Sequence, residues 1–79
     1  MTQSAEDCAR AILRIFSGQD VRAGHALMYS AVNVQFLEGY SAEDFAAGLG
    51  YAIDREWLSN ENTLIRLTQS GFDESQKLK

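Results

Sequence analysis

The fold is decided by residues 41–72, which read SAEDFAAGLGYAIDREWLSNENTLIRLTQSGF. The stretch opens with Ser41-Ala-Glu-Asp44, a pattern in which the serine hydroxyl caps a helix and the acids face its positive end. Apolar side chains then recur at positions 45, 49, 52 and 53, the spacing of one helix face. We therefore expect a helix over residues 41–55, with Phe45, Leu49 and Ile53 in the core.

Two glycines, Gly48 and Gly50, lie inside this expected helix. Each costs about 1 kcal/mol of helix propensity relative to alanine. A helix that keeps both needs a reason, and the ordinary one is the close approach of a neighbouring backbone. We expect another element to pack tightly against this helix.

Residues 57–67 predict two strands joined by a turn. Trp57-Leu58-Ser59 and residues 63–67 contain the β-branched and aromatic residues that favour strands. Between them Asn60-Glu61-Asn62 suits a tight turn, because asparagine tolerates positive φ angles. Residues 73–79 are polar apart from Leu78 and are expected to form a C-terminal tail, so the predicted domain spans residues 1–72.

The first half of the chain begins with a second capped helix. Ser4-Ala-Glu-Asp7 repeats the pattern of residues 41–44, and Cys8, Ile12 and Phe16 follow on one helical face. We expect a helix over residues 4–17, with Leu13 at the edge of its apolar stripe. Leu13 is therefore a candidate for an exposed apolar side chain.

Residues 30–38 allow two interpretations. Val32, Val34 and Phe36 alternate with polar residues as in a half-buried strand, whereas Tyr29, Val32 and Phe36 recur at helical spacing. So short a run does not decide between them. Residues 26–28, Ala-Leu-Met, are consistent with a short strand.

The second half of the chain resembles a known family. Phe45-Ala-Ala-Gly48-Leu49-Gly-Tyr51-Ala, then Trp57-Leu, then Ile65-Arg-Leu-Thr-Gln-Ser-Gly71-Phe72, is similar to a pattern of small bacterial winged-helix-like proteins. The resemblance covers residues 41–72 closely and the first half only in layout. One departure is Glu56, because such domains often carry glycine between the third helix and the wing.

The resemblance implies a winged-helix-like α+β fold of three helices with a small antiparallel β-hairpin, the wing. Residues 30–38 would then be the second helix, and a strand near 26–28 would pair with the hairpin. In DNA-binding members the exposed face of the third helix enters the major groove. A surface of this kind would use, on the helix, Asp44, Ala47, Tyr51, Asp54 and Arg55, and on the wing, Asn60, Glu61, Asn62 and Arg66.

Charge argues against nucleic acid as the partner of that surface. The 79 residues contain 7 Lys and Arg against 11 Asp and Glu, a net charge of −4. In the third helix three acids face one base, Arg55, which gives −2 there. Phosphates would be repelled, although a positive stripe through Arg22, Arg55 and Arg66 would favour DNA. We expect a protein-interaction or dimerisation module, with a DNA-binding transcriptional regulator as the alternative.

Tyr51 has two interpretations within that expectation. As the largest apolar group on the outer side of the third helix, it would anchor a protein partner. Alternatively it packs over its own domain and contributes to monomer stability. A variant that loses the ring separates the two.

No residue pattern indicates catalysis. Cys8 and His25 are the single cysteine and histidine, and Cys8 falls on the core stripe of its helix, where thiols are usually inert. There is no metal-ligand spacing and no phosphate-binding loop, so we expect a non-enzymatic protein without metal or cofactor. One cysteine makes no internal disulfide, the first residues do not resemble a signal peptide, and no apolar run could span a bilayer. These features predict a cytoplasmic protein.

Overall fold

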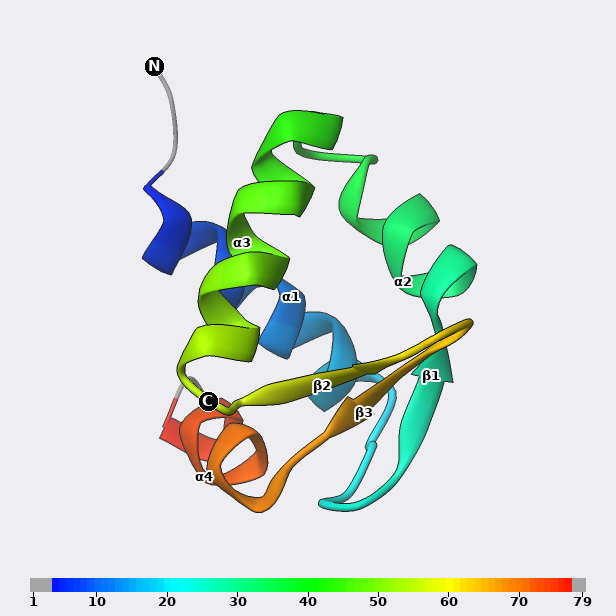
Figure 1. Cartoon of the computed structure of the whole chain (residues 1–79), viewed down its shortest axis with the longest axis vertical. Coiled ribbons are helices and arrows are strands. Elements are labelled where there is room, and N and C mark those ends of the chain that lie inside the picture. The colour runs from blue at the N-terminus through cyan, green and yellow to red at the C-terminus, as the bar shows by residue number, and fades with distance from the viewer. Residues whose placement is uncertain (1–3, 78–79) are drawn as a thin grey trace.

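The computed structural model describes residues 4–77, which form four helices and three strands. Figure 1 shows α3 crossing α1, with α2 beside them and the hairpin of β2 and β3 below α3. In chain order the elements are α1 (Ala5–Gly18), β1 (Ala26–Met28), α2 (Tyr29–Phe36), α3 (Ala42–Asp54), β2 (Leu58–Glu61), β3 (Leu64–Leu67) and α4 (Gln69–Lys77). Across residues 4–77 every helix is too short or too polar to span a lipid bilayer.

Serine caps start α1 and α3, as the sequence predicts. The Ser4 hydroxyl accepts from the Asp7 N–H at 3.1 Å, and the Ser41 hydroxyl accepts from the Asp44 N–H at 3.1 Å. The Asp44 carboxylate in turn accepts from the Ser41 N–H at 3.3 Å, which completes a capping box. Two orphan N–H groups at the start of α3 are thereby satisfied.

The three strands form an antiparallel sheet in the order β1-β3-β2. The central strand pairs Ile65 with Leu27 on one side and with Asn60 on the other. The short strand at residues 26–28 pairs with the hairpin as expected. The ambiguous segment is a helix, α2, in which Val32 and Phe36 are buried and Val34 is 63% exposed.

The expectation of three helices is wrong by one, because α4 follows β3 directly. The Thr68 hydroxyl caps it, accepting from the Gly71 N–H at 3.0 Å, and donates to the Trp57 carbonyl oxygen at 2.8 Å. A Cβ at position 71 would overlap that carbonyl, so glycine lets α4 lie against the start of β2. Residues 73–77, expected as a tail, thus belong to a helix packed on α1, while residues 78–79 lie outside the described part.

Two core assignments need correction. Ile53 is 36% exposed, because the buried side of α3 consists of Phe45, Gly48, Leu49 and Ala52. Leu13 is fully buried, because three helices, α2, α3 and α4, pack on α1. The buried face of α1 is therefore wider than contact with a single helix would require.

Candidate interaction surface

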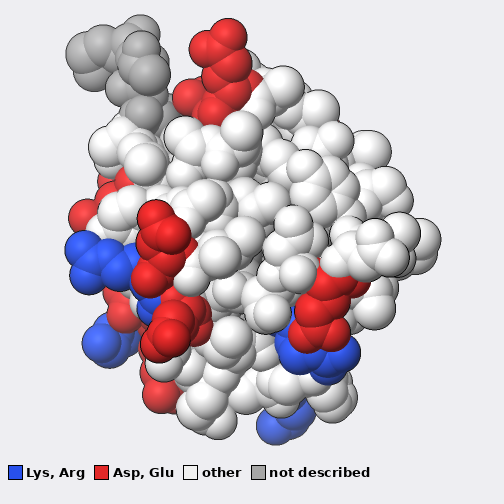
Figure 2. Space-filling model, viewed as in Figure 1, with Lys and Arg blue, Asp and Glu red and all other residues white. Residues whose placement is uncertain are grey.

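The outer face of α3 carries a row of small or aliphatic side chains. Ala46, Ala47, Gly50 and Ile53 are all exposed, and we call these four residues the outer row. Figure 2 shows the middle of this face of the molecule without charged side chains, and charged groups of both signs towards its margins. The outer row therefore offers an uncharged surface that a neighbouring molecule can approach closely.

The predicted surface residues of α3 fall into different environments. Asp44 is engaged in the capping box, and Ala47 and Asp54 are exposed. Arg55 ends the helix with its guanidinium carbon 5.1 Å from the centre of the Tyr51 ring. Of the five predicted helix positions, Ala47, Asp54 and Arg55 are thus exposed, and Arg55 also contacts the Tyr51 ring.

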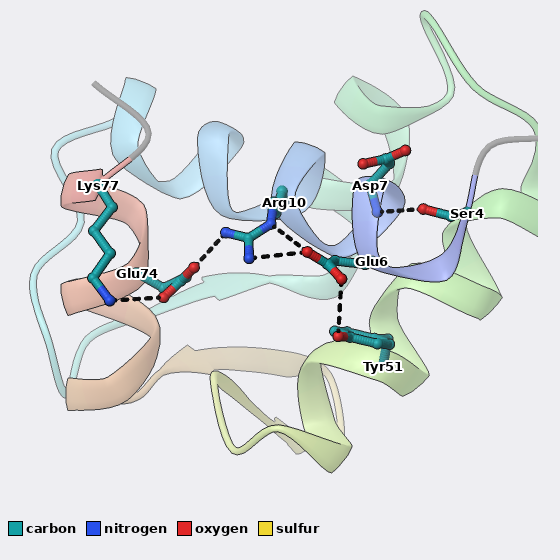
Figure 3. A network of polar contacts seen from close by, with 7 residues as sticks. All are labelled: Ser4, Glu6, Asp7, Arg10, Tyr51, Glu74 and Lys77. Atoms are coloured by element: carbon teal, nitrogen blue, oxygen red, sulfur yellow. Dashed lines mark hydrogen bonds and ion pairs between the residues drawn. The ribbon is translucent and has the colours of Figure 1, made fainter.

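Tyr51 belongs to a polar network that joins three helices (Figure 3). Its hydroxyl donates to Glu6 Oε1 at 3.4 Å, and Glu6 Oε2 accepts from Arg10 Nε at 3.2 Å. Arg10 also pairs with Glu74 of α4, whose other carboxylate oxygen lies 3.5 Å from Lys77 Nζ. The network connects α1 to α3 through Tyr51 and to α4 through Glu74.

Trp57 lies under this network. Its ring centre is 5.7 Å from that of Tyr51 and 5.2 Å from the guanidinium carbon of Arg10. Tyr51 is half-buried and packs against the core, so its contacts are those of the intramolecular interpretation. Hydrogen bonding to Arg10 lowers the pKa of Glu74, and hydrogen bonding to Glu74 raises the pKa of Arg10.

The β2–β3 hairpin, predicted to be the wing, pairs its single arginine with an acid. Arg66 Nε donates to Glu61 Oε2 at 2.6 Å, and Arg66 also donates to the Gly24 carbonyl oxygen. Hydrogen bonding to Arg66 lowers the pKa of Glu61. Asn60 and Glu61 lie in β2, whereas Asn62 occupies the turn with a φ of 66°. The predicted wing residues are therefore together, but they present a closed ion pair.

The three arginines considered for a positive stripe have separate environments. Arg66 pairs with Glu61, and Arg55 covers Tyr51. Arg22 and Asp20 both line a hollow between the end of α1 and α4. The three arginines therefore contact different parts of the molecule.

The chemistry-bearing residues are dispersed. Burial raises the pKa of the Cys8 thiol, with smaller contributions from the nearby Asp44 and Asp7 carboxylates. His25 is exposed in the loop before β1. Within the described residues no three His, Cys, Asp or Glu side chains come together as a metal site would require. Cys8 is fully buried, so its thiol is not accessible to reagents in solution.

One feature that sequence reasoning missed is a hollow between the end of α3 and β2. Its volume is about 420 Å³, and it is lined by Ile53, Glu56, Leu58, Ser59, Asn60 and Thr68. The available signal was Glu56, which adopts a φ of 62° where the resembled proteins often carry glycine. That left-handed residue turns the chain sharply from α3 into β2.

Comparison with known proteins leaves this surface as the source of functional inference. No family model matches the chain, and neither a curated protein nor a solved structure is significantly similar to it. Its function is therefore inferred from the outer row of α3, the wing and the hollow between them.

Proposed function

We propose that the chain is a winged-helix-like domain that acts by binding another protein and has no catalytic role. The order of its elements and the position of the hairpin after α3 support the winged-helix part of the proposal. The buried free thiol of Cys8 suits a reducing compartment such as the cytoplasm.

The observation that carries the proposal is the chemistry of the outer row. In DNA-binding winged helices the corresponding face needs cations for phosphates and polar side chains for base edges. Here the row consists of Ala46, Ala47, Gly50 and Ile53, flanked by Glu43 and Asp54. Small side chains on a helix let a partner's backbone approach, and burial of Ile53 would contribute favourable apolar contact.

Photo-crosslinking in the native cell tests the proposal. A photoreactive amino acid replaces Ala47 in the outer row, and a matched variant carries it at Gln76, which is also exposed on a helix, α4. We expect a defined protein adduct from position 47 and a much weaker or different pattern from position 76. A nucleic-acid adduct at position 47, or the same adducts from both positions, would contradict the proposal.

A DNA-binding transcriptional regulator is the second candidate, supported by the element order alone. The arrangement of α1, α2 and α3 with the hairpin places α3 next to β2, as DNA-binding members require. The ion pair of Arg66 with Glu61 and the acids at both ends of α3 weigh against it. Titration with duplex DNA separates the two candidates, as described below.

A further inference from the structure

The outer edge of β2 carries unpaired backbone groups. The Thr68 N–H donates to the Trp57 carbonyl oxygen at 3.1 Å, so residue 57 points its backbone groups towards the β3 side. Successive residues of an antiparallel strand alternate in this direction. Leu58 and Asn60 therefore direct their N–H and C=O groups away from β3, and no backbone group within residues 4–77 pairs with them there.

The other strands confirm the alternation. The Tyr29 N–H donates to the Thr63 carbonyl oxygen at 2.8 Å, and the Leu67 N–H donates to the His25 carbonyl oxygen at 2.8 Å. Odd-numbered residues of β3 thus face β1 and even-numbered residues face β2. β1 also has an outer edge, but it is three residues long and its last residue, Met28, already serves as the N-cap of α2.

The hollow lies beside the free edge of β2. Leu58, Ser59 and Asn60 line it from the strand. Ile53 lines it from α3, and Thr68 lines it from the position after β3. A strand added to β2 would run about 4.8 Å away from it, and its side chains would alternate in direction. One side chain of an added strand can therefore enter the hollow and contact Ile53.

We propose that β2 takes up an extended segment of a partner protein as a fourth strand, with an aliphatic side chain in the hollow and a Lys or Arg near Glu56. This inference deepens the proposed function, on which it rests for the partner being a protein. Backbone hydrogen bonds supply affinity in such strand addition, and side-chain pockets supply specificity. The added strand would satisfy the four outward groups of Leu58 and Asn60.

Charge selects a basic segment over a second copy of this chain. Glu56 lines the hollow, Asp54 precedes it, and neither makes an ion pair among the described residues. The β2 strand of a second copy, Leu58–Glu61, has no cation to place beside Glu56. A Lys or Arg in a partner's segment would be attracted to Glu56 across the paired strands.

Selection from a random heptapeptide library displayed on phage, with the full chain as the target, tests the proposal. We expect enriched peptides to alternate aliphatic residues and to carry Lys or Arg near one end. Hydrogen exchange by NMR then locates the bound peptide. Hydrogen exchange at the amides of Leu58 and Asn60 should slow by about tenfold or more at saturation, and the exchange rate of the Met28 amide should not change.

Two substitutions complete the test. Asn60→Pro removes an outward N–H and places the proline ring at the edge of β2. Met28→Pro is the control on β1, where the φ of −65° suits proline. Asn60→Pro should weaken peptide binding about tenfold and Met28→Pro less than twofold. If Asn60→Pro does not fold, Ile53→Lys should give the same loss, because it places a cation in the hollow.

The outcomes that overturn the proposal differ from those that overturn the proposed function. Acidic enriched peptides, protection at amides other than Leu58 and Asn60, no enrichment at all, or unchanged binding by Ile53→Lys would exclude strand addition by a basic segment. Protection of the same amides that appears with protein concentration alone would assign the edge to a second copy. A protein adduct at position 47 in any of these cases would leave the proposed function standing.

Discussion

Gly48 of α3 lies against the backbone of Cys8 in α1. A Cβ at position 48 would be 2.6 Å from the Cys8 Cβ and 2.7 Å from the Cys8 carbonyl carbon. Side-chain atoms do not approach so closely, so only glycine allows this separation of the two helices. The contact fixes how α3 sits on α1, and with it the direction in which the outer row faces.

Replacing Gly48 should therefore destabilise the domain. Gly48→Ala forces α1 and α3 apart, at a cost of about 1–3 kcal/mol that outweighs a gain of about 1 kcal/mol in helix propensity. We expect a lower melting temperature in a thermal unfolding experiment. Gly50→Ala is the control, because its Cβ would meet no atom within 4 Å and should raise stability by up to about 1 kcal/mol. Equal effects of the two substitutions would exclude the close contact.

The domain should be more stable with glycine at position 56. Its φ of 62° lies in the left-handed region, which costs a non-glycine residue about 1–2 kcal/mol. Part of that gain is offset by the greater freedom of glycine in the unfolded chain. We expect Glu56→Gly to raise the free energy of unfolding by about 0.5–1 kcal/mol in urea titration. Glu56→Ala, which removes the same charge but keeps the strain, should change it little, and a matching gain there would assign the effect to charge.

The Glu74–Arg10 pair should make stability depend on pH. Hydrogen bonding to Arg10 holds the pKa of Glu74 below its ordinary value of 4.5. The stabilisation is complete above that ordinary value and is lost as pH falls through the lowered folded pKa. Urea midpoints of wild type and Glu74→Gln should differ at neutral pH and converge as pH falls through the lowered pKa of Glu74. In an Arg10→Gln background the same substitution should have a smaller effect, because Glu74 has lost the partner that lowers its pKa.

Much of the fold could be predicted because its signals are local. The serine caps at Ser4 and Ser41 and the apolar spacing behind them set the limits of α1 and α3 correctly. The fourth helix could not be predicted in this way, since only Gly71 and Ser75 of α4 are buried. Its position depends on the contact of Gly71 with Trp57, fourteen residues away in sequence and invisible to periodicity.

The candidate site was less predictable than the fold. Ala47 and Asp54 are exposed as expected, because helical spacing gives the outer side of α3. The role of Tyr51 could not be read from spacing, because it depends on Trp57 and Glu6 from other elements. The free edge of β2 depends on strand order, and the sequence of residues 57–67 predicts a hairpin without saying which strand lies outside.

Duplex DNA should bind weakly. With acids at both ends of α3 and Arg66 paired, we expect no binding tighter than about 10⁻⁵ M at physiological salt in a fluorescence anisotropy titration. A variant with Glu43→Lys and Asp54→Lys should bind more tightly and with steeper salt dependence, which confirms that the assay detects this surface. Submicromolar, salt-dependent binding by wild type would make the DNA-binding regulator the first candidate.

The most direct test of binding through the outer row uses the protein crosslinked at position 47, purified and titrated by calorimetry. Ala47→Arg places a bulky cation in the row, and Gln76→Arg adds the same side chain to α4. We predict that Ala47→Arg weakens binding by about tenfold or more without lowering the melting temperature, and that Gln76→Arg binds as wild type does. Equal affinity for wild type and Ala47→Arg would contradict the central claim.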